Sequence, residues 1–464
     1  MVKSAWRRGL LLAFVLAAVV WMTTLLTNVP VVRGVEMPAE PSVSGGALGA
    51  TEFLSIYLPM VMRNHPPIEV RALWVSRFDW TRYGATATLA DVQHVVSDVA
   101  HAGFNTIFFQ ARGAGDAYYT PGPEPWAARL TGSLGPTLGR DPGFDPLATM
   151  ISLAHASGIS VHAYINVYPA WQAPPLHPDY PTKTYGLITP TLGITPPQWL
   201  NQLTYSSPKG TVGLGYRWRV YDSPMITGYM PVSWDDYVWA SPAVPAVQES
   251  VLTVTAYLLS HYALDGIHLD YVRYPGPQYS YDPFTLAAYG QVSHTITITD
   301  WRGDFQRDQV SNLVARISMQ TQAHGVMLSA AVWPRYTQGR DDYFQDSKAW
   351  LASGSMDAIA PMMYTSDMIT DVVKWTGIAQ GFQLSANGRW VLPGIGVELN
   401  SACVGFDQIA ARIEAARSLG AAGQAIFSYG ALRDCKDAGV PYLDLLQSGP
   451  YATPASLPRM TWSR

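Results

Sequence analysis

Short apolar runs alternate with longer amphipathic stretches along the chain from Glu69 onward. Each short run is almost continuously hydrophobic, which is typical of parallel strands that are covered on both faces. This alternation predicts βα units of the α/β class, and eight such runs favour a closed (β/α)8 TIM barrel. The predicted strands are Val70–Ser76, Thr106–Arg112, Ser160–Asn166, Gly266–Tyr271, Val326–Val332, Ala358–Tyr364, Trp390–Val397 and Gln424–Tyr429.

Helical periodicity lies between these runs. An open, doubly wound sheet is the alternative fold, but it calls for a glycine-rich phosphate loop after the first strand, and residues 76–80 do not provide one. The predicted helices are Leu89–Ala102, Pro146–Ser157, Val247–His261, Gln306–His324, Phe344–Ala352 and Phe406–Leu419.

The connection between the third and fourth strands, residues 167–264, is unusually long. It is rich in Pro, Tyr and Trp and contains a hairpin-like segment at Tyr216–Tyr221. Long loops after barrel strands lie over the active-site face, so we expect this insertion to form a wall of the site.

The N-terminus resembles an export signal. Lys3, Arg7 and Arg8 precede the apolar run Gly9–Leu26, which is followed by a stretch rich in Pro, Ser, Gly and Ala. A cleaved signal and an uncleaved membrane anchor both fit a run of this length. We therefore predict a signal peptide or anchor at 1–35, a flexible spacer at 36–66, the barrel at 67–448 and a C-terminal tail at 449–464, with the barrel outside the cytoplasm.

The composition narrows the choice of partner. Hydrophobic residues make up 48% and charged residues 14%, which excludes a disordered chain, and the net charge of −4 makes nucleic acid an unexpected partner. The 16 Trp and 26 Tyr outnumber the 13 Phe, and rings with a polar handle suit sugar rings. A polysaccharide is therefore the expected partner, and no cofactor is expected.

The fourth predicted strand carries the strongest candidate for chemistry. In Asp265-Gly-Ile-His-Leu-Asp, the period of two places His268 and Asp270 on the inner face, with Asp270 near the end of the strand where barrel active sites lie. We expect Asp270 to act as a nucleophile or base. Asp265, at the other end of the strand, is expected to be structural.

The second predicted strand ends in Arg112, followed by Asp116 and Glu124 on the adjoining loop. A guanidinium at a strand end can hold a carboxylate or sugar hydroxyls. The two acidic residues are candidate catalytic carboxyl groups, although loop acids also commonly cap turns.

Other strand ends carry aromatic and polar residues that we expect to bind substrate. Two histidines near Asp270 also allow a metal site, but no His-x-His or HExxH motif supports one. The predicted substrate-binding residues are His162, Asn166, Tyr168, Trp333, Tyr364, Asp367 and Glu398.

Five segments of the chain form a specific combination: Arg71-Ala-Leu-Trp-Val, the block from Asn105 through Arg112-Gly-Ala-Gly-Asp-Ala to Glu124-Pro-Trp, Pro142-Gly-Phe-Asp-Pro-Leu, Val161-His-Ala-Tyr-Ile-Asn and Asp265-Gly-Ile-His-Leu-Asp-Tyr-Val-Arg-Tyr-Pro. Together they resemble the glycosyl-hydrolase-like family 10 proteins, over about residues 69–446. The resemblance implies an exported (β/α)8 glycosidase-like protein, and the family includes an envelope enzyme that cleaves peptidoglycan strands stripped of their peptides. Some relatives carry two successive aspartates where this chain has Asp270-Tyr271.

Glycoside cleavage uses two carboxyl groups, one ionised and one protonated. We expect Asp270 to be ionised and oriented by Arg112 and His268, with Glu124 or Asp116 as the acid ahead of Asp367 or Glu398. A catalytically silent glycan-binding barrel and a metal-dependent hydrolase or deacetylase are the alternatives.

The only two cysteines, Cys403 and Cys435, follow the last two predicted strands. These strands are neighbours in a closed barrel, so we predict a disulfide between the two cysteines, with two free thiols as the alternative.

Overall fold

The structure is a computed structural model that describes residues 66–462 apart from 121, 133–136, 173–204, 208–209, 213–217, 221–225, 230–236, 278–284, 286–287 and 291–303. The predicted signal segment and nearly all of the predicted spacer lie outside the described residues. Residues 64–464 form one compact unit, which is described here.

Nine strand segments of the described chain form one parallel sheet in the order β13-β12-β11-β10-β3-β2-β1-β17-β14. Each predicted run contributes to it, and most bounds agree within one or two residues. The segments are β1 (Val70–Val75), β2 (Thr106–Arg112), β3 (Ser160–Asn166), β10 (Gly266–Asp270), β11 (Met327–Val332), β12 (Ala358–Pro361), β13 (Trp390–Val391), β14 (Gly394–Gly396) and β17 (Gly423–Phe427).

The sheet closes on itself through the stretch 390–396. Its first half, β13, pairs with β12, and its second half, β14, pairs with β17. Pro393 lies between the halves and has no N–H to donate, while its carbonyl accepts a hydrogen bond from the Ala425 amide at 3.2 Å. The two halves therefore serve as one interrupted strand, and the predicted eight-stranded barrel is confirmed.

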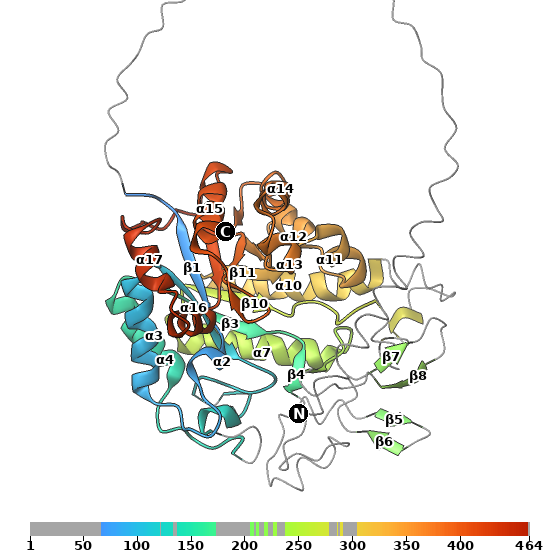
Figure 1. The fold of residues 1–464 in the computed structure, drawn as a ribbon. Helices are drawn as coiled ribbons and strands as arrows, with labels where there is room; N and C mark the ends of the chain where they lie inside the picture. Colours follow the sequence, from blue (N-terminus) through green and yellow to red (C-terminus); the bar gives the residue numbers. More distant parts are fainter. Residues whose placement is uncertain are drawn as a thin grey trace, which may run out of the picture. The chain divides into compact units, whose positions relative to one another are not determined.

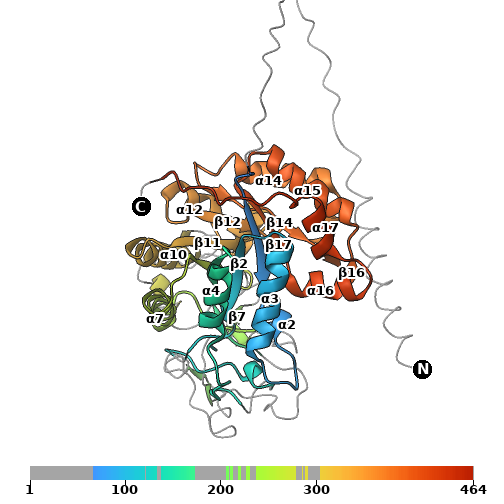
Figure 2. The ribbon, with the colours of Figure 1, turned by 90° about the vertical axis from the view of Figure 1, so that its left-hand side faces the viewer.

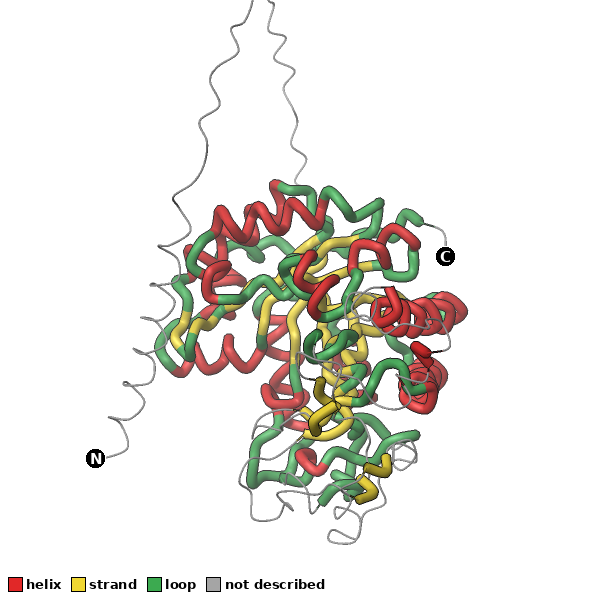
Figure 3. The backbone as a smooth tube through the Cα atoms, turned by 90° about the vertical axis from the view of Figure 1, so that its right-hand side faces the viewer, coloured by secondary structure: helices red, strands yellow, loops and turns green. Residues whose placement is uncertain are grey.

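Helices surround the strands, as Figures 1 and 3 show. Consecutive barrel helices pack side by side, and Figure 2 shows α3 beside α4. The predicted helices are present, but the one expected at Phe344–Ala352 begins at Ser347, and several shorter helices were not predicted. The helices are α2 (Arg77–Trp80), α3 (Leu89–His101), α4 (Pro146–Ala156), α7 (Pro245–His261), α10 (Gln306–Ala323), α11 (Tyr336–Asp342), α12 (Ser347–Ser353), α13 (Ser366–Ile369), α14 (Val372–Gln383), α15 (Phe406–Ser418), α16 (Tyr429–Asp437) and α17 (Tyr442–Ser448), with a 3₁₀ turn η1 (Ala128–Leu130).

Alternating strand residues supply two separate cores. In β1, Leu73 and Val75 join the large core between strands and helices, whereas Ala72 and Trp74 point into the barrel. The inner core combines large rings with several alanines, which leave room for them. Its buried members are Val70, Ala72, Trp74, Phe108, Tyr164, Ala331, Ala360, Leu392 and Ala425.

The insertion between β3 and β10 contains short antiparallel strands. β4 (Pro169–Gln172) pairs with β9 (Tyr237–Trp239), and β7 (Trp218–Val220), which lies in the predicted hairpin segment, pairs with β8 (Ile226–Tyr229). A third pair joins β5 (Tyr205–Ser207) to β6 (Gly210–Val212). β4 and β9 bring the two ends of the insertion together next to the barrel strands.

A buried ion network holds the amino ends of the strands. Glu69, just before β1, accepts hydrogen bonds at 2.7 Å from Arg71 Nε and from Arg417 Nη2 on α15. Burial alone would raise the pKa of Glu69, but these two guanidinium groups lower it below its ordinary value of 4.5. The network ties the first strand to a late helix.

Residues 449–462, predicted as a tail, lie against this end of the barrel. The Glu69 amide donates to the Ser456 carbonyl at 3.0 Å, and the Ser456 amide donates to Pro67 at 2.9 Å. Trp462 packs against Trp390 and donates from Nε1 to Asp357 at 2.7 Å.

The predicted disulfide is present between Cys403 and Cys435. Cys403 lies in β16 (Ala402–Cys403), which pairs with β15 (Glu398–Leu399), but Cys435 lies in α16 rather than in a loop. The bond joins the segments that follow the last two barrel strands.

No helix in the described part of the chain is both long and apolar enough to cross a bilayer.

Replacing Glu69 by Gln should lower the free energy of unfolding by about 3 kcal/mol, because the fully buried guanidinium of Arg71 and the partly buried one of Arg417 lose their counter-charge. The pKa of Glu69 is lower in the folded state, so its stabilisation is present above the unfolded value of 4.5 and is lost as the pH falls through the folded value. Denaturant unfolding should therefore show a large difference from wild type at pH 7 that shrinks below about pH 4. Glu414→Gln, which alters an exposed partner of Arg417, should change stability several times less.

Candidate active site

Asp270 ends β10 at the barrel mouth, meaning the end where the carboxyl ends of the strands lie. It is partly exposed, and each carboxylate oxygen accepts one hydrogen bond: Oδ2 from the Tyr164 hydroxyl at 2.8 Å and Oδ1 from the Tyr271 amide at 2.6 Å. Burial raises the pKa of Asp270, while Tyr164, the Tyr271 amide and Arg273 oppose the rise. A carboxylate with a donor on each oxygen is held in a fixed orientation.

His268 lies below Asp270 inside the barrel and is fully buried. Its Nε2 accepts a hydrogen bond from Trp74 Nε1 at 3.0 Å, and its Nδ1 lies 2.9 Å from the Ser329 hydroxyl. The indole N–H is only a donor, so the proton of the neutral imidazole lies on Nδ1. Burial and then the nearby His162 lower the pKa of His268 well below 6.5.

We predicted that Arg112 and His268 orient Asp270, but in the structure Tyr164 and the Tyr271 amide hold its carboxylate. Both His268 nitrogens are engaged by Trp74 and Ser329, and its ring stacks on Phe108 with centroids 4.0 Å apart. His268 therefore supports the aromatic floor of the mouth.

Tyr364 belongs to the same floor. Its ring stacks on Phe427 with centroids 4.7 Å apart and meets Trp74 edge-on at 6.2 Å. Burial raises the pKa of Tyr364 well above 10, and the charges of Asp270 and Tyr271 add to the rise. Tyr364, a predicted substrate-binding residue, is therefore close enough to Asp270 for the charge of Asp270 to raise the pKa of Tyr364.

Arg112 and Glu124 form a buried ion pair. Arg112 Nε lies 2.9 Å from both Glu124 oxygens, and Nη2 lies 2.8 Å from Oε1. Nη1 donates to the carbonyls of Asn166, Val167 and Pro169, which fixes the start of the long insertion. The Glu124 side chain has no exposed surface, so this geometry favours a structural role over that of the general acid.

Asp116 lies on the same loop but is partly exposed. Its Oδ1 accepts from the Ala114 amide at 2.7 Å, and its charge helps to raise the pKa of Arg77, which burial alone would lower. Arg77 donates from Nη2 to the Tyr237 hydroxyl at 2.8 Å, and the Tyr237 ring packs edge-on against Tyr271 at 5.2 Å. A continuous row of side chains therefore links Asp116 to the residue beside Asp270.

The three candidates from the third strand lie in different places. His162 lines a cavity of about 370 Å³ at the amino ends of the strands, together with Asp265 and residues 457–460, so it lies opposite the mouth. Tyr168 is fully buried in the outer core. Asn166 pairs with Asp270 across the strands, and its buried amide has no hydrogen-bond partner among the described residues.

The position of each residue along the strand, which parity does not give, explains these outcomes. His162 shares the inner face with Tyr164 and Asn166, but it lies at the opposite end of the strand, a position that alternation alone does not distinguish. Tyr168 lies two residues beyond the strand, where the period of two no longer applies. Of the three, only Asn166 lies beside Asp270.

The remaining candidates lie around the rim. Trp333 follows β11, stacks on Tyr343 at 4.0 Å and donates from Nε1 to Gln338 at 2.9 Å. Asp367 pairs with Lys374 at 2.5 Å and with Arg335, and Lys374, Thr365 and Arg335 lower its pKa far below 3.8. It is therefore an ionised rim residue rather than a proton donor.

Glu398 lies beside the disulfide. With Cys403 and Cys435 it forms the one group of three potential metal ligands found within the described ranges. The two sulfurs are bonded to each other, so this group fits a disulfide rather than a metal centre. Burial, and then Asp434, raises the pKa of Glu398.

The structure also brings in residues that the sequence analysis did not select. Asp79, after β1, has a pKa raised to about 6 by burial, opposed by hydrogen bonds from Ser76, Gly430 and Ser428. These donors saturate its carboxylate, which suits a structural link between the first and last loops. Tyr271 has a φ of 50°, an uncommon left-handed conformation for a tyrosine, directly after Asp270.

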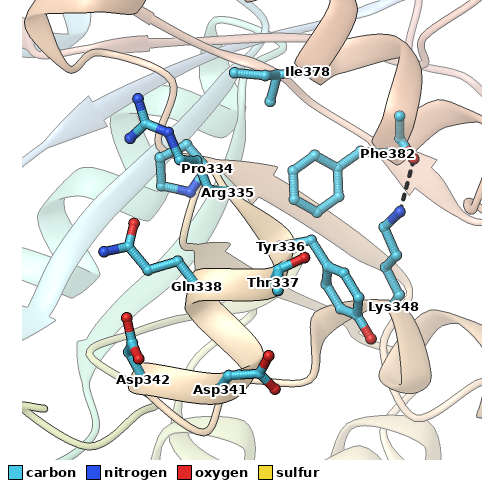
Figure 4. Close-up of a pocket in the computed structure, with 11 residues that line it drawn as sticks. Pro334, Arg335, Tyr336, Thr337, Gln338, Asp341, Asp342, Lys348, Ile378 and Phe382 are labelled. Atoms are coloured by element: carbon cyan, nitrogen blue, oxygen red, sulfur yellow. Dashed lines mark hydrogen bonds between the residues drawn. The ribbon is translucent and has the colours of Figure 1, made fainter. Parts of the chain in front are cut away.

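A separate open groove of about 780 Å³ lies between α11, α12 and α14. Figure 4 shows Tyr336, Phe382 and Ile378 along it, with Lys348 donating to the Gly381 carbonyl. Neither Asp270 nor its aromatic floor lines this groove. It is distinct from the barrel mouth.

A carboxylate and aromatic rings at the carboxyl end of a (β/α)8 barrel are the arrangement found in many glycoside hydrolases. The sequence profile of the Glycosyl hydrolase-like 10 family matches residues 69–178 and 218–381, and the chain belongs to this family.

Curated relatives agree with this assignment. Glycosyl hydrolase YngK of Bacillus subtilis is 24% identical over 342 residues, covering 67% of this chain and 57% of the relative. Glycosyl hydrolase DigH of Escherichia coli K12 is 27% identical over 327 residues, covering 64% of this chain and 65% of the relative. The match thus spans less than two thirds of each relative's length.

Among solved structures, the glycoside hydrolase domain of PgaB (BpsB) from Bordetella bronchiseptica superposes with a TM-score of 0.53 at 13% identity. The match covers 85% of this chain and 100% of that domain. At this identity the likeness shows the fold alone.

Replacing Glu124 by Gln should lower the free energy of unfolding by about 3–5 kcal/mol, because Arg112 would keep a buried charge without its counter-charge. Asp367→Asn, in an ion pair exposed to solvent, should change stability far less. Thermal and denaturant unfolding of both variants provide the measurement. Equal effects of the two substitutions would contradict the structural role of Glu124.

Proposed function

We propose that this protein is an exported glycoside hydrolase that cleaves O-glycosidic bonds of a polysaccharide, namely a cell-wall glycan such as peptide-stripped peptidoglycan. The observation that carries the proposal is the partly exposed Asp270 carboxylate, held by Tyr164 and the Tyr271 amide above an aromatic floor. Membership of a glycosyl-hydrolase-like family supports the reaction class. The N-terminal apolar run and the disulfide support export.

Asp270 acts in this proposal as the ionised carboxylate, either as nucleophile or as base for water. Both of its bound groups are hydrogen-bond donors, which favours the charged form. Its raised pKa increases its basicity, which suits a group that attacks a sugar carbon or removes a proton from water.

Asp116 is the proposed second carboxyl group. Unlike Glu124 it is partly exposed, and unlike Asp367 it is not held by two cationic side chains. The contacts of Arg77 with Tyr237 and of Tyr237 with Tyr271 support a role for Asp116 at the same mouth as Asp270. Trp333 and Tyr364, which are partly exposed, would contact the sugar, whereas Asn166 is fully buried beside Asp270.

Replacing Asp270 by Asn should lower turnover of peptide-stripped peptidoglycan by about 10³-fold or more. Asp265→Asn is the matched control, because it changes the same residue type at the opposite end of the same strand, and it should leave most of the turnover intact. Product masses from intact and stripped peptidoglycan and from neutral polysaccharides provide the measurement. Substantial cleavage by a folded Asp270→Asn protein would rule out the assigned role.

Asp116→Asn in the same assay separates the hydrolase from a silent glycan-binding barrel. The hydrolase requires a loss of turnover with glycan binding retained. If the wild-type protein binds these glycans without producing fragments, the binding alternative is supported instead.

Replacing Tyr164 by Phe should move the acidic limb of the kcat/KM profile to higher pH. Activity requires ionised Asp270 and is therefore lost as the pH falls through the pKa of this residue; Tyr164 lowers that pKa, and removing its hydroxyl raises it. Tyr336→Phe, which loses a similar hydroxyl-to-aspartate bond to Asp346 on the outer helices, should leave the limb in place. A shift to lower pH in the Tyr164 variant would contradict the assignment.

A further inference from the structure

Arg273 lies three residues after Asp270 and is surrounded by aromatic rings. The rings come from the insertion, from the loop after β10 and from the segment after β11, and the Arg273 Cζ lies 5.0–5.3 Å from each ring centroid. The four residues are Trp239, Tyr271, Trp333 and Tyr343. These faces attract the cation and hold the plane of the guanidinium in place.

The hydrogen bonds of Arg273 do not use all the N–H donors of its guanidinium group. Nη1 donates to the Tyr274 carbonyl at 3.1 Å. Nε is enclosed and has no partner in the described part of the chain, and Nη2 donates no hydrogen bond there but, unlike Nε, is not enclosed. Nη2 is therefore the unused N–H group of Arg273 that an incoming anion can reach, and a guanidinium N–H donates a strong hydrogen bond to a carboxylate.

No carboxylate of the described chain forms an ion pair with Arg273. Asp270 attracts it electrostatically, but both Asp270 oxygens already accept hydrogen bonds from Tyr164 and Tyr271. Arg273 is half-buried, and burial lowers the pKa of its guanidinium. A half-buried guanidinium with an unused donor gains more from an incoming anion than a fully solvated one does.

We propose that Nη2 of Arg273 binds a carboxylate on the saccharide, so that the preferred substrates are acidic sugars rather than neutral ones. This inference rests on the proposed hydrolase function and specifies the substrate class of the same site. The carboxylate can belong to a hexuronate or to the ether-linked acid of peptide-stripped peptidoglycan, since both present a carboxylate oxygen.

The test compares peptide-stripped peptidoglycan strands with the same strands after reduction of their carboxyl groups to alcohols. The wild-type ratio of kcat/KM should favour the acidic strands by about 30-fold, the value of a charge-assisted hydrogen bond. In Arg273→Gln the ratio should fall to within about threefold of one, mainly through KM. Because both substrates are cleaved by the same Asp270, any change in the pKa of Asp270 cancels in the ratio.

Two further variants control for charge and folding. Arg340→Gln removes a half-exposed arginine of α11 that pairs with Asp341, and it should leave the wild-type ratio unchanged. Arg273→Lys keeps the charge but not the planar guanidinium and should retain an intermediate ratio. Thermal unfolding identifies any variant that has lost its fold, and an oligohexuronate tested alongside distinguishes the two sources of carboxylate.

Calorimetric titration with the same strands separates this inference from the proposed function. Selective binding of acidic strands that requires Arg273, without any cleavage, would reject the hydrolase and keep the carboxylate site. Cleavage with equal preference for acidic and reduced strands, or an unchanged ratio in Arg273→Gln, would overturn the carboxylate site and leave the hydrolase in place. Equal binding without cleavage would reject both.

Discussion

Closure of the strand ring through residues 390–396 is the constraint on which the rest of the structure depends. One half of this stretch pairs with β12 and the other half with β17, which pairs in turn with the first strand, β1, so the ring of strands is complete. Without this link the sheet would have two edges and its strand ends would not surround a common axis. With it, Asp270, Tyr364 and the loop carrying Asp79 all lie around one mouth.

Buried charge is handled in two ways in this barrel. Glu69 with its two arginines and Glu124 with Arg112 are closed ion pairs whose hydrogen bonds are internal to the protein. Asp270 and Arg273 are neighbours in sequence and in space, yet each keeps its principal hydrogen bonds with neutral groups. Paired charges therefore stabilise the frame, whereas Asp270 and Arg273 form no ion pair with any residue that the structure describes.

The aromatic composition that first suggested a sugar partner has two structural uses. Trp74, Phe108 and His268 fill the barrel interior, and small residues such as Ala72 and Ala425 make this possible. Trp239, Tyr271, Trp333 and Tyr343 surround Arg273 at the mouth instead. The count of rings did not separate these roles, because both need the same flat, partly polar side chains.

The order of elements, the parallel barrel and the inner position of Asp270 were readable from the sequence, because strand alternation and apolar runs are local properties. The disulfide between Cys403 and Cys435 was predicted from the same topology, because the two cysteines follow neighbouring strands. The sequence also shows a proline at position 393. Its consequence, two half-strands with different partners, depends on which strands lie beside it.

Only the tertiary structure decided which of the polar candidate residues remain accessible for chemistry. Glu124 and Asp116 lie on one loop, yet only Glu124 reaches Arg112 and is sealed from solvent. His162 shares a face with Asn166 but lies at the opposite end of the barrel. Burial, charge pairing and height along a strand depend on residues distant in sequence, and a local pattern therefore indicates which side chains face inward but not which of them remain available for chemistry.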